Sequence, residues 1–114
     1  MRVLTLAAVA TTLALPAAAH HGWGGYDSQK TMKVQAAILE MKYENPHAEI
    51  VFQHQGKRWT ATLAPVFRMR NRGLPEGALA KGKTVIVEGY PSRVNEGELR
   101  AERITVDGKT VELR

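Results

Sequence analysis

The chain has 114 residues, no cysteine, and a formal net charge of +5 from 16 Lys and Arg against 11 Asp and Glu. This length fits one domain with a single modest core. The lack of cysteine excludes disulfides and thiolate metal sites, which leaves His, carboxylates and amines as candidate ligands. The basic residues are interspersed with Glu rather than clustered, so a solvated mixed surface is favoured over a nucleic-acid partner.

The first 19 residues have the features of a secretory signal peptide. Met1-Arg2 gives a minimal basic region, Val3 to Leu15 is apolar apart from two threonines, and Ala17-Ala18-Ala19 supplies the small residues that signal peptidase requires. The apolar run is shorter than the ~20 residues of a membrane span, and no second one follows. We therefore expect a signal helix, export to the periplasm, cleavage after Ala19, and no stable membrane insertion afterwards.

Residues 20–30 are expected to form an extended N-terminal arm. The stretch HHGWGGYDSQ (20–29) contains three glycines and no apolar periodicity. Such an arm becomes ordered only if it docks on the domain. Trp23 and Tyr26 are the residues expected to anchor it, because an aromatic ring buries a large area at little cost in conformational entropy.

Residues 31–114 predict a mainly β domain. Polar and apolar residues alternate between Thr31 and Tyr43, which favours a long strand, although Ala, Glu, Met and Lys would also suit a helix. Turns are expected at Asn45-Pro46, Gln55-Gly56-Lys57 and Asp107-Gly108. The other expected elements are strands at 47–54, 58–63, 84–90, 99–106 and 110–113, a short helix within 65–73 and a loop over 74–83.

The order of these elements is three strands, a short helix and two strands, with a possible extra strand at the end. That is the order of an OB-type barrel, a Greek-key barrel with a helix between its third and fourth strands. The predicted fold is therefore an OB-like barrel of five to six strands with one short helix, over residues 31–114.

Several motifs together resemble a family of small exported proteobacterial proteins, the domain-of-unknown-function family six-one-five-two. They are His20-His21-Gly22-Trp23 with the following Tyr26-Asp27, Asn45-Pro46-His47-Ala48, and Val87-Glu88-Gly89-Tyr90-Pro91. The resemblance covers essentially the whole chain after the signal. The chain departs from the usual pattern in Gly-Trp-Gly-Gly, where many members have Ser-Phe-Ala, and in its Pro65-Val66-Phe67 segment. The resemblance implies a periplasmic β-barrel-like domain with no enzymatic activity.

Cleavage after Ala19 would make His20 the new N-terminus and create a candidate copper(II) site. The amine and Nδ1 of His20 can chelate one ion, and a second imidazole in trans would complete an all-nitrogen set suited to tetragonal Cu(II). His21 offers a second route through the amine, a deprotonated amide and its imidazole. A cut after Ala18 would instead place His21 third, as in amino-terminal copper and nickel chelates.

The distant ligand would be His47 or His54. These residues are seven apart, so on one regular strand their side chains point to opposite faces. His47 follows a turn and has Glu44 and Glu49 nearby, which makes it the better candidate. The predicted metal ligands are therefore His20, His21 and His47. The alternative is structural: the arm histidines face solvent, and His47 caps the Asn-Pro turn by hydrogen bonding.

A second class of function is binding by the barrel face. OB barrels bind ligands through their second and third strands and the flanking loops. Here that face could display Phe52, His54 and Trp59 beside Arg68, Arg70 and Arg72, and could take an anionic glycan or an envelope protein partner. In the structural alternative Phe52 and Trp59 belong to the core, and the three arginines form a solvated helix edge. No nucleophile–base, phosphate-loop or zinc-protease motif is present, so a non-enzymatic binding or accessory protein is expected.

Overall fold

The computed structural model describes residue 3 and residues 22–114. The expected signal helix and the histidines at 20 and 21 lie outside this part of the chain. The elements in chain order are η2 (Trp23–Gly25), β1 (Met32–Ala37), β2 (Glu40–Lys42), β3 (Glu49–His54), β4 (Lys57–Thr62), α1 (Val66–Asn71), η3 (Glu76–Leu79), β5 (Thr84–Pro91), β6 (Glu98–Val106) and β7 (Lys109–Glu112).

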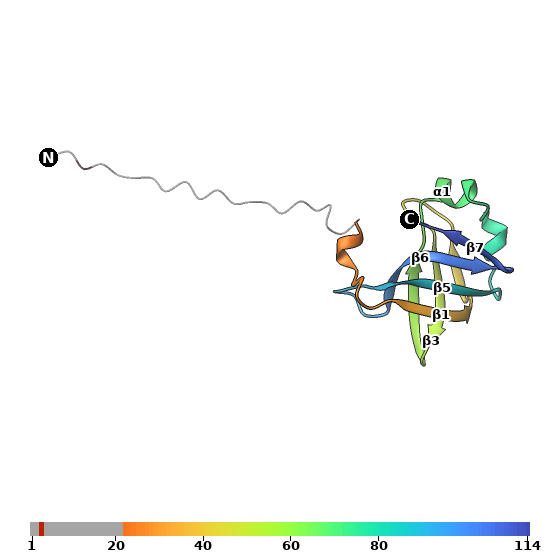
Figure 1. The fold of residues 1–114 in the computed structure, drawn as a ribbon, viewed down its shortest axis with the longest axis horizontal. Coiled ribbons are helices and arrows are strands. Elements are labelled where there is room, and N and C mark those ends of the chain that lie inside the picture. The colour runs from red at the N-terminus through yellow and green to blue at the C-terminus, as the bar shows by residue number, and fades with distance from the viewer. Residues whose placement is uncertain (1–2, 4–21) are drawn as a thin grey trace.

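The strands form one curled sheet that confirms the OB-like prediction (Figure 1). Its order is β1-β5-β6-β4-β3-β2, and β1 and β2 are consecutive along the chain, so this pair joins the two ends of the order. All pairings are antiparallel except that of β4 with β6, which is parallel. β7 adds to β6 beyond the segment that pairs with β4, and is the extra strand expected at the end.

The predicted strand over residues 31–43 is bent rather than continuous. The backbone N–H of Ile38 donates to the carbonyl of Lys83, whereas the N–H of Leu39 donates to the carbonyl of Val51. The chain therefore changes partner from β5 to β3 between these two residues. This change of partner divides the strand into β1 and β2, and the helical alternative for this segment is wrong.

The local turn signals are confirmed by backbone geometry. The β3–β4 connection has positive φ at Gln55 and Gly56, and the β6–β7 connection has positive φ at Asp107 and Gly108. Positive φ at both central residues is the mark of a tight hairpin turn. The predicted loop over residues 74–83 differs in one respect, because it contains the short 3₁₀ helix η3.

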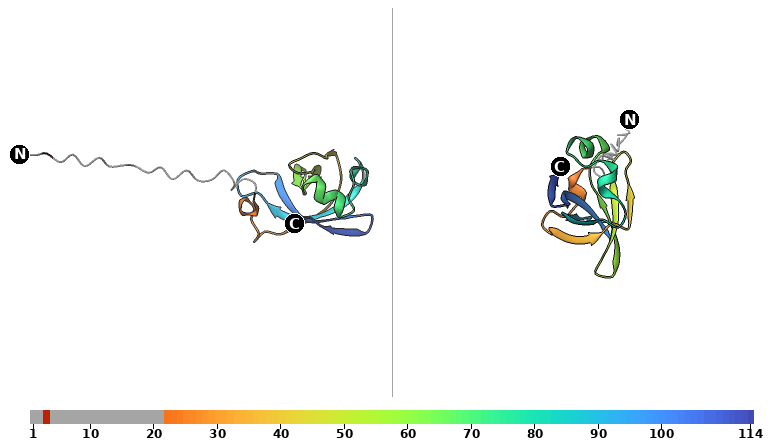
Figure 2. Two further views of the ribbon diagram at one scale, coloured as in Figure 1. Left: turned by 90° about the horizontal axis from the view of Figure 1, so that it is seen from above. Right: turned by 90° about the vertical axis from the view of Figure 1, so that its right-hand side faces the viewer.

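A single core fills the barrel, and α1 and η3 lie at one end of it, while the β3–β4 hairpin extends at the other end (Figures 1 and 2). Alternating residues of the strands supply the core, including Ile50 and Phe52 of β3 and Val85 and Val87 of β5. Among the described residues, no helix is long and apolar enough to cross a membrane.

A β-bulge divides β6 into two halves with opposite facing. The pairing with β5 shifts register between Glu88 and Gly89. Before the shift the core-facing residues of β6 are Leu99 and Ala101, and after it they are Ile104 and Val106. The face of β6 that carries Arg100 is therefore the outer one, away from the core.

Candidate functional site

The N-terminal arm docks on the outer end of β5 and the turn that follows it. The N–H of Asp27 donates to the carbonyl of Pro91, and the N–H of Arg93 donates to the carbonyl of Gly25, both at 2.9 Å. Tyr26 forms an isolated antiparallel bridge with Ser92. The arm thus continues the sheet for a few residues, which fixes η2 beside the β5–β6 turn (Figure 1).

Trp23 is the main side-chain contact of the arm. Its ring meets Tyr90 of β5 edge-on, with centroids 6.1 Å apart. The Cζ atoms of Arg100 and Arg114 lie 4.7 and 4.6 Å from the centroid of the same ring. Both distances are well inside the range of a cation–π contact. One indole therefore binds two guanidinium groups, one from β6 and one from the residue that follows Leu113.

Arg100 is the buried centre of this cluster. It stands directly opposite Tyr90 in the β5–β6 register, and only 6% of its surface is exposed. Burial lowers the pKa of its guanidinium, as do the charges of Arg68 and Arg114, whereas a hydrogen bond with Tyr26 raises it. A guanidinium stays protonated despite such shifts, so a full positive charge lies beneath the arm.

His47 meets the same guanidinium from the other side. It follows the cis Asn45-Pro46 bond and precedes Ala48, whose N–H donates to the carbonyl of Ala64 at 2.8 Å. Nη2 of Arg100 lies 3.4 Å from Nε2 of His47. Because a guanidinium can only donate, Nε2 is the acceptor. The structure thus brings the arm and the Asn-Pro-His turn to one place.

Of the three predicted metal ligands, only His47 lies among the described residues. There it is near Trp23 through Arg100, and not beside the carboxylates that its sequence suggested: Glu44 pairs with Lys42 at 3.8 Å. Within residue 3 and residues 22–114, no three His, Cys, Asp or Glu side chains gather closely enough to hold a metal ion. His47 could supply one ligand from the barrel.

His54 lies at the opposite end of β3, near the hairpin tip. β3 begins at Glu49, so His47 precedes the strand and the two histidines are not on one regular strand. The ring of His54 meets Trp59 of β4 edge-on at 6.2 Å. Phe52 is fully buried and Trp59 packs partly buried against the core, as the structural alternative predicted.

The three arginines of α1 are not a free basic edge. Nη1 of Arg68 donates to the carbonyl of Leu113 at 3.0 Å, and Nη1 of Arg72 donates to the carbonyls of Glu112 and Arg114. The guanidinium of Arg70 lies over the ring of Tyr43. Arg68 and Arg72 therefore hold the chain after β7 against α1, so the expectation of a solvated edge is wrong for these two.

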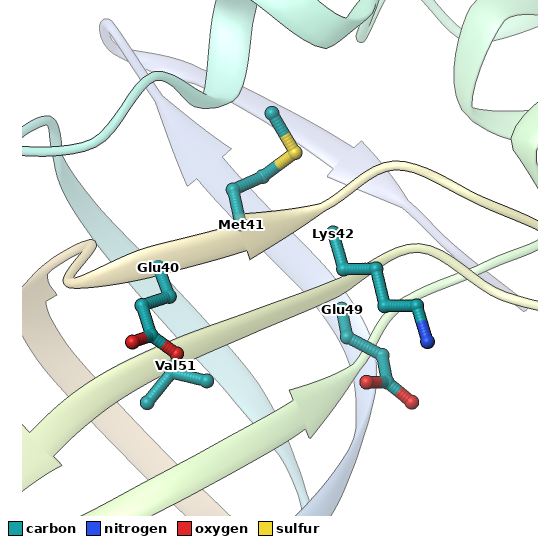
Figure 3. A pocket seen from close by; sticks show the side chains of 5 residues that line it. All are labelled: Glu40, Met41, Lys42, Glu49 and Val51. Carbon is teal, nitrogen blue, oxygen red and sulfur yellow. The ribbon is translucent and has the colours of Figure 1, made fainter.

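A shallow hollow lies on the outer side of β2 and β3 (Figure 3). It is lined by Glu40, Met41, Lys42, Glu49 and Val51 and has a volume of about 180 Å³. Ligand-binding pockets are usually larger, at roughly 300–1,000 Å³, and more apolar. The Glu40 carboxylate is also paired with Arg58 at 2.7 Å. The arm cluster is the better candidate site.

Two residues in this cluster were not predicted from the sequence, namely Arg100 and Arg114. The apolar positions of the sixth strand contain the one available signal. They fall on odd numbers at Leu99 and Ala101 and on even numbers at Ile104 and Val106, which indicates a bulge between them. Such a bulge places Arg100 on the outer face, where the arm docks.

Comparisons with known proteins place the chain in a family without assigning a function. Among the solved structures that match is the crystal structure of the ZRD-deleted mutant of TiaS in complex with agmatine, at 19% identity and a TM-score of 0.50. The match covers 77% of this chain and 25% of that one, so this chain spans about a quarter of that protein's length; the similarity concerns the fold alone. The comparison with curated proteins gives no match. The model of the family of unknown function DUF6152 matches residues 8–100, and the chain belongs to that family.

Proposed function

We propose that this protein is an exported, periplasmic accessory protein that binds copper(II) at its processed N-terminus and has no catalytic role of its own. Signal cleavage after Ala19 would free the α-amine of His20. That amine, the imidazoles of His20 and His21, and the imidazole of His47 are the proposed ligands. They are all nitrogen donors, which suit tetragonal Cu(II) better than they suit hard cations.

The observation that carries this proposal is the shared contact of Trp23 and His47 with Arg100. The ring of Trp23 lies 4.7 Å from the Arg100 Cζ, and Nε2 of His47 lies 3.4 Å from its Nη2. His20 is three residues before Trp23, and consecutive Cα atoms are 3.8 Å apart, so its Cα is within about 11 Å of that of Trp23. The docked arm therefore begins within reach of His47.

The second candidate function, an OB-type module for an anionic glycan or an envelope protein, has less support. It relies on a basic face near α1. Arg68 and Arg72 already donate to backbone carbonyls at the end of the chain, which reduces what they can offer to a ligand. If that function applied, Arg70→Gln would weaken ligand binding, increasingly so at low salt, and metal would be irrelevant.

The test is a Cu(II) titration of protein produced with its own signal, after mass spectrometry has established the N-terminal residue. We expect His20 as the first residue and one tightly bound Cu(II) per chain. A matched chain with one extra alanine before His20 should lose most of this affinity, because the chelating amine is displaced. An unchanged affinity in that chain, or in His20→Ala, would contradict the proposal.

A further inference from the structure

The ring of His47 has one lone pair, and Arg100 already occupies it. The guanidinium has five N–H donors and no acceptor, so Nε2 of His47 must accept at the 3.4 Å contact. In a neutral imidazole the proton then resides on Nδ1. A histidine nitrogen binds a metal only through a free lone pair, so the nitrogen available to copper is the one that faces Arg100.

We propose that Arg100 competes with the metal for Nε2 of His47, and so sets the affinity of the site. This inference rests on the proposed function. When copper binds, the Arg100–His47 hydrogen bond breaks and a copper–His47 bond forms at the same nitrogen. When copper leaves, the hydrogen bond forms again. No proton or electron is gained or lost at His47 in this exchange.

Arg100 is held in place by contacts that do not involve His47. Its guanidinium lies against the face of Trp23 and hydrogen-bonds Tyr26, and its side chain is almost fully buried between the arm and β6. It therefore remains near Nε2 after losing His47 as an acceptor. Both the lost hydrogen bond and the nearby positive charge lower the affinity for a cation. A site with such a competitor releases copper readily, as suits a protein that passes the ion to a partner.

The chain offers a matched control for this residue. Arg114 contacts the same Trp23 ring at 4.6 Å, against 4.7 Å for Arg100, and carries the same charge. Its guanidinium pairs with Glu102 at 3.7 Å. Arg114→Met therefore removes one charge and one cation–π contact from the arm. Arg100→Met removes the same two features and also the hydrogen bond to His47.

The experiment compares Cu(II) affinity, by competition titration, in chains that begin at His20. The variants are wild type, Arg100→Met, Arg114→Met, His47→Ala and the double variant Arg100→Met/His47→Ala. We expect Arg100→Met to bind copper about tenfold more tightly than Arg114→Met, the order for one hydrogen bond to a charged donor. This gain should vanish when His47 is alanine.

Three outcomes separate the possibilities. If Arg100→Met binds copper no more tightly than Arg114→Met, or keeps its gain without His47, the competition is refuted and Arg100 only positions the arm. If wild type binds no copper, the proposed function fails and this inference with it. Nitrogen NMR of metal-free wild type gives a test that needs no variant: the His47 proton should be on Nδ1, and a proton on Nε2 would overturn the inference.

Discussion

Nη2 of Arg100 lies 3.4 Å from Nε2 of His47, although the two residues are 53 positions apart in the sequence. The contact joins the outer face of β6 to the turn that precedes β3. Trp23 of the arm lies on the same guanidinium. This relationship links the three segments by which the chain resembles its family, and the predictions below follow from the groups around it.

Trp23→Ala should detach the arm and destabilise the protein. The ring has one edge-on contact with Tyr90 and two cation–π contacts, each worth about 0.5–1 kcal/mol. We expect a loss of about 2 kcal/mol in the free energy of unfolding, measured by urea denaturation. Trp23→Phe keeps an aromatic face and should lose less than half of that. Equal losses in the two variants would show that the ring contacts do not hold the arm.

Gly89→Ala should be among the more damaging small substitutions in the protein. A Cβ at Gly89 would collide with the backbone carbonyl of Arg100, which cannot move without disturbing the bulge. Overpacking of this kind costs about 1–3 kcal/mol, so we expect a clear drop in the thermal midpoint. Gly77→Ala is the matched control, because nothing lies within 4 Å of its added Cβ. If both variants melt at the same temperature, the close approach of β5 and β6 is not as described.

The arginines of α1 should differ from one another in their effect on stability. Arg68 donates to the carbonyl of Leu113 at 3.0 Å, so Arg68→Gln should cost about 1 kcal/mol in the free energy of unfolding. Arg70 lies over the exposed side of Tyr43 and makes a weaker contact, so Arg70→Gln should be nearly neutral. Chemical denaturation of both variants gives the comparison. A larger loss for Arg70→Gln would reverse the roles assigned to them.

Stability should fall at high pH partly because of Tyr43. Burial raises the pKa of its hydroxyl above 10.0, and the hydroxyl donates to the carbonyl of Leu74 at 2.6 Å. A pKa raised on folding gives a contribution that is complete below the unfolded value and is lost as pH rises through the folded value. Urea unfolding at pH 8 and pH 11 should show a smaller pH-dependent loss in Tyr43→Phe than in wild type. Equal losses would mean that Tyr43 ionises as freely in the folded chain as in the unfolded one.

Much of the barrel could be predicted because its signals are local. Gln55-Gly56 and Asp107-Gly108 specify tight turns through their backbone preferences, and Pro65 and Gly73 bracket α1. The bend at Ile38 could not be predicted this way, because it depends on which strands lie on either side of that residue. Propensity alone carries no information about a change of partner.

The candidate site was predicted only at its ends. The aromatic anchors of the arm and the Asn-Pro-His turn are visible as short motifs, whereas Arg100 appears as an ordinary charged residue in a strand. Its role arises from three long-range contacts, with Trp23, Tyr26 and His47. Arg68 and Arg72 were misread for the same reason, since their acceptors are carbonyls more than 39 residues away. Only the change from odd to even apolar positions in β6 pointed to the facing of Arg100.

The measurement that tests the central claim most directly is pulsed EPR of the copper-loaded chain that begins at His20, which detects coordinated imidazole rings by their remote nitrogens. We predict that His47→Ala, loaded with the same amount of Cu(II), shows one coordinated imidazole fewer than wild type. Identical spectra for the two chains would mean that copper is bound by the arm alone, and would contradict a site shared between the arm and the barrel.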